Sequence, residues 1–172
     1  SGGGVTLTGG EVTAQPDFAA AVLAGCRGQG IHTAVETCGA CSWDRLERLL
    51  AHTDLVLYDL KLMDDALHRR WTGASNRLIL ENAARLAGRR AQMRVPLIPG
   101  ITDTDENLRA IFTFMREHAL TDVALLAYNA SAGAKYEWLD RPYELTGEPQ
   151  SRERLETFVA TAREAGVRAE IG

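Results

Sequence analysis

The chain has 172 residues, of which 45% are hydrophobic and 24% charged, and its formal net charge is −4. This composition is typical of a globular domain, so we expect a single domain over residues 1–172. The acidic balance gives no indication of nucleic acid or an anionic membrane as a partner. No apolar run approaches the roughly 20 residues that span a bilayer. Three cysteines are too few for a disulfide framework, which favours a cytoplasmic location.

Six apolar or β-branched segments predict strands, and helical spacing predicts helices between nearly all of them. The strands are expected near residues 4–8, 31–36, 55–59, 92–97, 122–127 and 167–171, and the helices at residues 17–29, 42–51, 64–71, 76–87, 104–118 and 151–165. Ser42, and either Asp103 or Thr104, are expected to cap helices. The alternation predicts an α/β fold in which right-handed crossovers join a parallel sheet.

Polar residues follow the ends of most predicted strands. They are, in chain order, Gly9-Gly10-Glu11, Glu36-Thr37, Asp59 with Lys61, and Tyr128-Asn129, while Arg94 lies inside its own strand. In parallel α/β folds, ligands bind at the C-terminal ends of the strands. Polar groups from five strands therefore predict one ligand site at that edge of the sheet.

The segment from Leu55 to Met63 carries the clearest of these signals. Residues 55–59 are a short, mostly apolar run that predicts a buried strand ending in a carboxylate. Asp59 and Lys61 are two residues apart, so on an extended backbone they point to the same side. Together they could bind a zwitterion, with Asp59 on an amino group and Lys61 on a carboxylate. A surface ion pair worth about 0–1 kcal/mol is the alternative interpretation.

Seven short motifs occur in the order and at about the spacing of a known family. They are Gly2-Gly3-Gly4-Val5-Thr6, Thr8-Gly9-Gly10-Glu11, Gly30-Ile31-His32-Thr33, Glu36-Thr37-Cys38-Gly39, Asp59-Leu60-Lys61, Arg94-Val95-Pro96-Leu97-Ile98-Pro99-Gly100 and Leu125-Leu126-Ala127-Tyr128-Asn129. Together they resemble the radical S-adenosylmethionine (radical SAM) enzymes that activate glycyl radical enzymes, of the pyruvate formate-lyase activating enzyme type. The resemblance implies a partial, open TIM-like β/α barrel with parallel strands, and a radical SAM core that lacks its first strand.

The same resemblance implies a site for S-adenosylmethionine at the strand ends. The backbone of Gly9-Gly10-Glu11 would hold the amino group of S-adenosylmethionine, and Asp59-Leu60-Lys61 would hold its methionine end. Arg94 would reach the carboxylate or the ribose, for which a guanidinium fork is well shaped. Asn129 stands where the family often has a histidine, and it would contact the adenosine part.

A monovalent cation is a further expectation from the resemblance. In some of these enzymes the residues that match Glu36, Thr37, the Leu57 carbonyl and Asp59 would surround such an ion. Oxygen ligands suit a hard cation. Glu36 and Thr37 are therefore counted among the expected residues of the cofactor site.

The chain departs from the family at the cluster motif. The family's reaction needs a C-x3-C-x2-C loop that binds a [4Fe-4S] cluster, which cleaves S-adenosylmethionine to a 5′-deoxyadenosyl radical. Here Cys26 is expected as a small core residue, and the C-x-x-C spacing of Cys38 and Cys41 is a weak indication of metal binding or a redox pair. We therefore expect a fragment without the N-terminal cluster-binding segment. Only the intact protein would carry the cluster, and the fragment alone would be inactive.

Two protein partners are implied by the resemblance. They are a glycyl radical enzyme, of the formate-lyase or dehydratase type, and an electron donor such as flavodoxin or ferredoxin for the intact enzyme. Residues 128–149 show no clear period and carry Lys135, Tyr136, Trp138, Arg141 and Tyr143. Because aromatic and arginine side chains favour interfaces, we hypothesise that this stretch docks the partner's glycine loop. A flap packed on the barrel edge is the alternative.

Two other functions remain open. A β/α-barrel lyase could use Lys61 as a Schiff-base amine, but that reaction needs a neutral amine in a dry pocket, and the neighbouring Asp59 favours the ammonium form. A non-catalytic module could recognise a glycyl radical enzyme without any chemistry. Binding of S-adenosylmethionine would distinguish this module from the activating-enzyme interpretation.

Overall fold

The computed structural model describes residues 3–129 and 147–172. Its strands are β1 (Gly4–Leu7), β2 (His32–Thr37), β3 (Leu55–Asp59), β4 (Ala91–Pro96), β5 (Asp122–Leu126) and β6 (Arg168–Ile171). They form one six-stranded sheet in chain order, and every neighbouring pair is parallel. Repeated right-handed β–α–β units produce this order, so the predicted α/β fold is confirmed.

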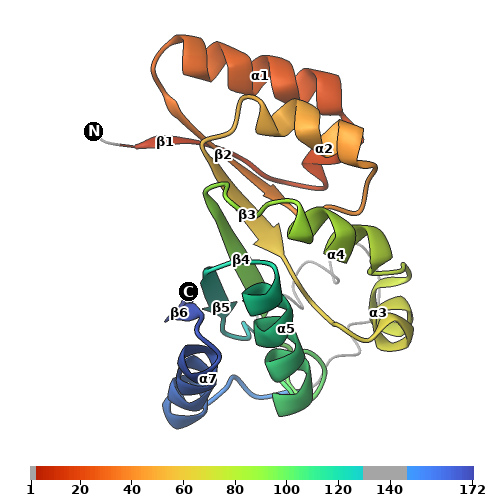
Figure 1. Cartoon of the computed structure of the whole chain (residues 1–172), viewed down its shortest axis with the longest axis vertical. Coiled ribbons are helices and arrows are strands. Elements are labelled where there is room, and N and C mark those ends of the chain that lie inside the picture. Colours follow the sequence, from red (N-terminus) through yellow and green to blue (C-terminus); the bar gives the residue numbers. More distant parts are fainter. Residues whose placement is uncertain (1–2, 130–146) are drawn as a thin grey trace.

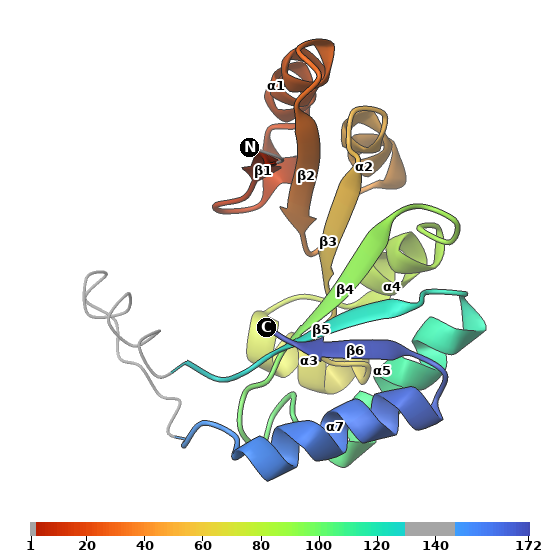
Figure 2. The ribbon, with the colours of Figure 1, turned by 90° about the vertical axis from the view of Figure 1, so that its left-hand side faces the viewer.

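The helices lie on one face of a curved sheet (Figures 1 and 2). They are the 3-10 helix η1 (Val12–Ala14) and the α-helices α1 (Pro16–Gly28), α2 (Trp43–Leu50), α3 (Asp65–Thr72), α4 (Arg77–Ala84), α5 (Asp105–Glu117) and α7 (Arg152–Glu164). β1 and β6 are the two ends of the sheet, which does not close on itself. The barrel is therefore partial, as the resemblance implied. Among the described residues, none of the helices combines the length and apolar character needed to cross a bilayer.

The core lies between the sheet and the helices. In β3, Val56 and Tyr58 are buried, whereas Leu57 and Asp59 are only partly buried. Side chains alternate along a strand, and the Tyr58 hydroxyl donates a hydrogen bond to the Ile79 carbonyl oxygen in α4 (2.7 Å). Val56 and Tyr58 thus face the helices. Leu57 and Asp59 consequently face the helix-free side, which we call the inner face.

Local differences from the predictions have physical causes. The helix expected over residues 76–87 is α4 and ends at Ala84, before a turn in which Gly88 takes a positive φ of 78°. α5 is capped by Thr104 rather than Asp103, because the Thr104 hydroxyl accepts a hydrogen bond from the Asn107 amide. Ser42 is the N-cap residue of α2, but its side chain makes no capping hydrogen bond.

The expectation that Cys26 is a core residue is wrong. Cys26 is only half buried and lies outside the hydrophobic core cluster. α1 is an amphipathic surface helix whose fully buried residues are Ala19 and Leu23. Cys26 lies on the same side of α1, one turn beyond Leu23, but close to the C-terminal end of the helix, where it is only partly covered.

Candidate functional site

Charged side chains from three neighbouring strands meet on the inner face. Arg94 of β4 is the register partner of Asp59 of β3, and Glu36 of β2 is the register partner of Leu57. The Arg94 guanidinium donates to Asp59 Oδ1 from Nε (3.0 Å) and Nη2 (2.7 Å), and Nη2 also donates to Glu36 Oε1 (2.5 Å). Only 13% of the Arg94 side chain is exposed. This arginine therefore holds two carboxylates in fixed positions at the ends of β2 and β3.

Arg94 also keeps Glu36 ionised. The hydrogen bond from Arg94 lowers the pKa of Glu36 below its usual value, and this effect outweighs the partial burial that raises the pKa. A hydrogen bond from the Thr8 side chain lowers the pKa further. Glu36 is therefore a carboxylate at neutral pH, as an acceptor for a ligand's amino group needs to be.

Lys61 completes the charged group just beyond the end of β3. Its Nζ lies 3.8 Å from Asp59 Oδ2, the carboxylate oxygen that Arg94 does not use. The predicted convergence of Asp59 and Lys61 is thus confirmed. The amine of Lys61 lies in an ion pair at a partly exposed position instead of a dry apolar pocket, which argues against a Schiff-base lyase. The site thus holds two carboxylates and two cationic side chains. Together they can bind the amino and carboxylate groups of a zwitterion, because each side chain can exchange its present partner for a ligand group.

The turn after β1 carries two exposed glycines next to a fixed acid. Gly9 has a φ of 126°, which favours glycine, and a Cβ at Gly9 or Gly10 would meet nothing within 4 Å. The backbone here is therefore open to a ligand. Glu11 accepts hydrogen bonds from the Thr13 amide (3.1 Å) and hydroxyl (2.9 Å) within this turn.

Glu11 also binds the end of β2. It accepts hydrogen bonds from the Thr37 hydroxyl (2.6 Å), the Cys38 amide (3.0 Å) and the Cys38 thiol (3.1 Å). Burial raises the pKa of Glu11, but the hydrogen bonds from Thr37, Cys38 and Thr13 outweigh it and hold the pKa below its usual value. The carboxylate thus ties the glycine turn to β2.

The residues expected to surround a monovalent cation separate into two groups. Glu36 and Asp59 meet at Arg94 on the inner face, whereas the Thr37 hydroxyl donates to Glu11 and accepts from the Gly39 amide (2.9 Å). The described residues contain no group of three or more His, Cys, Asp or Glu side chains arranged to hold a metal ion. The positive charge between Glu36 and Asp59 is the Arg94 guanidinium.

The two other expected site residues lie at the same edge of the sheet. Leu60 is buried, and its amide donates to the Arg94 carbonyl oxygen (2.9 Å), so its side chain belongs to the core. Asn129 follows β5 and is exposed. The stretch hypothesised to dock a partner falls largely on residues 130–146, including Lys135, Tyr136, Trp138, Arg141 and Tyr143, and these lie outside the described residues.

Cys38 and Cys41 are free thiols on the loop after β2. Burial raises the pKa of both cysteines, and Cys38 donates its thiol hydrogen to Glu11 (3.1 Å). Both thiols are therefore protonated at neutral pH. A protonated thiol is a poor nucleophile and a poor metal ligand.

Sequence reasoning missed three asparagines that hold the loops after the strands. Asn82 Nδ2 donates to the carbonyl oxygens of Gly39 and Cys41 (2.9 Å each). Asn76 and Asn107 bind the segment that follows β3. All three are less than 8% exposed. Their positions at or inside predicted helices gave no local signal, because their partners in the loops after β2 and β3 lie 13 to 46 residues away.

Comparison with known proteins adds to this geometry. The family model of the radical SAM superfamily matches residues 2–114. The chain is 43% identical over 174 residues to an isethionate sulfite-lyase activating enzyme from Oleidesulfovibrio alaskensis, a match that covers 99% of this chain and 54% of that protein. It is 39% identical over 180 residues to a trans-4-hydroxy-L-proline dehydratase activating enzyme from Clostridioides difficile, covering 100% of this chain and 59% of that protein.

A solved structure has nearly the same extent as this chain. It is a domain of pyruvate-formate lyase-activating enzyme from Bacteroides vulgatus, with a TM-score of 0.82, 29% sequence identity and 99% coverage of both chains. The chain spans little more than half the length of the two curated relatives described above.

Proposed function

This chain belongs to the radical SAM superfamily, and from that premise we propose that its residues form the S-adenosylmethionine-binding part of an enzyme that activates a glycyl radical enzyme. The observation that carries the proposal is the meeting of Glu36, Asp59, Lys61 and Arg94 at the C-terminal ends of parallel strands. Ligands bind at this edge in parallel α/β folds.

The residues present fit S-adenosylmethionine. Its methionine end carries an amino group and a carboxylate, which match the carboxylates of Glu36 and Asp59 and the cationic groups of Lys61 and Arg94. The exposed Gly9-Gly10 backbone offers carbonyl oxygens that can also accept from the amino group. When bound, S-adenosylmethionine supplies the reactive sulfonium of this superfamily. The role of the chain's own residues is to bind and orient its methionine end.

The residues of this chain do not fit a [4Fe-4S] cluster. The C-x3-C-x2-C motif does not occur in the sequence. Cys38 and Cys41 lie on the loop after β2 and Cys26 lies in α1, and the described residues place no three His, Cys, Asp or Glu side chains where they could hold a metal ion. A cluster needs thiolate ligands that converge on it, and the three cysteines of this chain do not provide such a set.

The proposed partner is a glycyl radical enzyme. The relatives that support this are activating enzymes for a sulfite-lyase and a dehydratase. A formate-lyase is a further candidate, because the structural match is to a domain of pyruvate-formate lyase-activating enzyme. In the proposed cytoplasmic enzyme, flavodoxin or ferredoxin would supply electrons.

Titration of the chain with S-adenosylmethionine by isothermal calorimetry tests the proposal. We expect saturable binding that Lys61→Gln weakens roughly tenfold or more, because a hydrogen bond to a charged group contributes about 1.5–3 kcal/mol. Arg168→Gln is the matched control. It also removes one positive charge, but Arg168 pairs with Asp122 at the opposite end of the strands. No binding, or equal binding by the two variants, would overturn the proposal.

A further inference from the structure

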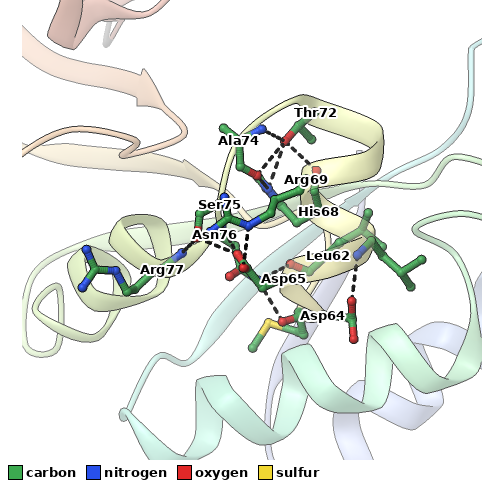
Figure 3. Close-up of polar contacts among 12 residues, drawn as sticks. Leu62, Asp64, Asp65, His68, Arg69, Thr72, Ala74, Ser75, Asn76 and Arg77 are labelled. Atoms are coloured by element: carbon green, nitrogen blue, oxygen red, sulfur yellow. Dashed lines mark hydrogen bonds and ion pairs between the residues drawn. The ribbon is translucent and has the colours of Figure 1, made fainter.

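The segment Lys61–Met63 begins two residues after the end of β3 and forms neither helix nor strand. Two buried asparagines fix its backbone. Asn76 Nδ2 donates to the carbonyl oxygens of Leu62 (3.0 Å) and Met63 (2.8 Å). Figure 3 shows Asn76 bound to Leu62 and held in turn by Asp65, whose Oδ1 accepts from the Asn76 amide (3.0 Å). The carbonyl oxygens of Leu62 and Met63 are therefore satisfied by one side chain at the start of α4.

Asn107 of α5 makes the second set of contacts. Its Nδ2 donates to the carbonyl oxygens of Lys61 and Thr102 (2.9 Å each), and its Oδ1 accepts from the Met63 amide (3.0 Å). A carboxamide has two N–H donors and one carbonyl oxygen, so all three groups are used. Asn107 is 7% exposed. A fully satisfied, buried side chain of this kind holds its partners in one arrangement.

The contacts of Asn107 continue to the strand that bears Arg94. Thr102 Oγ1 donates to the Pro96 carbonyl oxygen (2.5 Å) and accepts from the Ile98 amide (2.6 Å). Pro96 is the last residue of β4, two residues after Arg94. Hydrogen bonds thus run from the backbone of Lys61, through Asn107 and Thr102, to the end of β4. The backbone segments that carry Lys61 and Arg94 are thus connected by hydrogen bonds.

We propose that Asn107 is a positioning residue that fixes the backbone of Lys61, and so directs the Lys61 ammonium to its place beside Asp59. The inference rests on the proposed function, in which Lys61 holds the carboxylate of S-adenosylmethionine. Asn107 does not touch the ligand. Its effect arises because a lysine side chain has many rotamers, and a fixed backbone reduces the freedom lost when the ammonium binds.

A double-mutant cycle on S-adenosylmethionine affinity tests the proposal. Asn107→Ala is expected to weaken binding about fivefold or more, within the range seen for residues of one hydrogen-bond network. In the Lys61→Gln background the same change is expected to have little further effect. Equal fold-changes in both backgrounds would overturn the proposal, because they would mean that Asn107 does not act through Lys61.

A matched control separates positioning from loss of stability. Met115 lies in the same helix, about two turns after Asn107, at a fully buried position. Met115→Ala should therefore destabilise the fold without weakening binding to the same degree. If Met115→Ala weakens binding as much as Asn107→Ala does, the proposal fails. Should Asn107→Ala not fold, Asn107→Asp replaces it, since it keeps the shape but sets a carboxylate oxygen against two carbonyl oxygens.

A second measurement does not depend on ligand binding. Lys61 and Lys135 are the two lysines of the chain, so reductive methylation with a ¹³C label gives two lysine signals by NMR, and Lys61→Arg assigns them. We expect the Lys61 signal to shift and narrow in Asn107→Ala, with the Lys135 signal unchanged. An unchanged Lys61 signal overturns the positioning role. If the wild-type chain fails to bind S-adenosylmethionine but the Lys61 signal responds, the proposed function fails and the positioning of Lys61 by Asn107 stands.

Discussion

Glu11 joins the turn after β1 to the end of β2 with a single carboxylate. It accepts five hydrogen bonds, from Thr13, Thr37 and Cys38. A carboxylate suits this position because it is acceptor-only and has about four lone-pair sites. The exposed Gly9-Gly10 backbone is therefore anchored at the next residue, Glu11. This anchor lowers the conformational entropy lost when the turn becomes ordered around a ligand.

Glu11→Gln is expected to lower the free energy of unfolding by roughly 2 kcal/mol at neutral pH, since hydrogen bonds to a charged acceptor are lost. The pKa of Glu11 in the folded state lies below the value of 4.5 for an unperturbed glutamate. The stabilisation is therefore fully present above pH 4.5 and is lost as the pH falls through the folded-state pKa. Urea unfolding of both proteins at several pH values should show a difference that shrinks in that acidic range.

The control for Glu11 is Glu156→Gln on α7. Glu156 is 62% exposed and pairs with Arg152 one helical turn away. Its replacement should change stability by less than about 0.5 kcal/mol, as is usual for exposed pairs. A difference between wild type and Glu11→Gln that stays constant into the acidic range would show that the lowered pKa of Glu11 does not contribute.

At the scale of elements, two serines occupy the N-cap position of a helix, but only one of them makes a capping hydrogen bond. Ser151 and Ser42 are the N-cap residues of α7 and α2, and both are exposed. The Ser151 hydroxyl accepts a hydrogen bond from the Arg154 amide (3.2 Å), whereas the Ser42 side chain makes no such bond. The sequence analysis predicted only Ser42 as a cap, yet the capping bond belongs to Ser151, because residue type and position alone do not decide whether a hydroxyl reaches the amide.

Ser151→Ala is therefore expected to lower the free energy of unfolding by about 1 kcal/mol, as for other lost N-caps. Ser42→Ala is the matched control, with an expected change below about 0.5 kcal/mol. Chemical denaturation of both variants measures the two values. Equal losses would contradict the assignment of the functional cap to Ser151.

Amide side chains also hold the loops that follow the strands. Asn82 holds the loop after β2, and Asn76 and Asn107 hold the segment after β3. Gln150 binds the Tyr128 amide after β5 and the Leu97 carbonyl oxygen after β4 (3.0 Å each). Loops that carry binding groups are usually mobile. Here buried or partly buried carboxamides bind the loops after β2, β3, β4 and β5, so hydrogen bonds hold the backbone at this edge of the sheet.

At the scale of the whole molecule, the open sheet has two edges. β1 and β6 each pair with a single neighbour among the described strands. An edge strand presents unpaired backbone groups that can bind another chain, and lysines on an edge oppose this. Thr6 lies exposed in the middle of β1, where a charge would act on an approaching strand.

We expect the wild-type chain to associate as its concentration rises, and Thr6→Lys to shift the population towards monomers. Light scattering coupled to size-exclusion chromatography gives the mass at each concentration. Thr157→Lys, at an exposed position of α7, adds the same charge away from the edges and should behave as the wild type does. A monomeric wild type at every concentration would contradict this prediction.

Local sequence pattern predicts most of the fold and, within the site, the convergence of Asp59 and Lys61. The alternation of apolar runs and helical spacing predicted the parallel α/β sheet, because each period reflects the geometry of a single element. The two-residue spacing of Asp59 and Lys61 predicted their convergence, which the 3.8 Å distance between their charged atoms confirms. The contacts of Arg94 with Glu36 and Asp59 join residues 58 and 35 positions apart, and no local pattern contains them.

The sequence by itself determined the fold class, the edge of the sheet where the site lies, and the ordered motifs that resemble one family. Only the tertiary structure decided which partner each polar group takes. It directed the Thr37 hydroxyl to Glu11, left Cys26 half buried, and placed Asn107 against the backbone of Lys61. The physical reason is that secondary structure depends on neighbours along the chain, whereas the pairing of buried polar groups depends on what packing brings together.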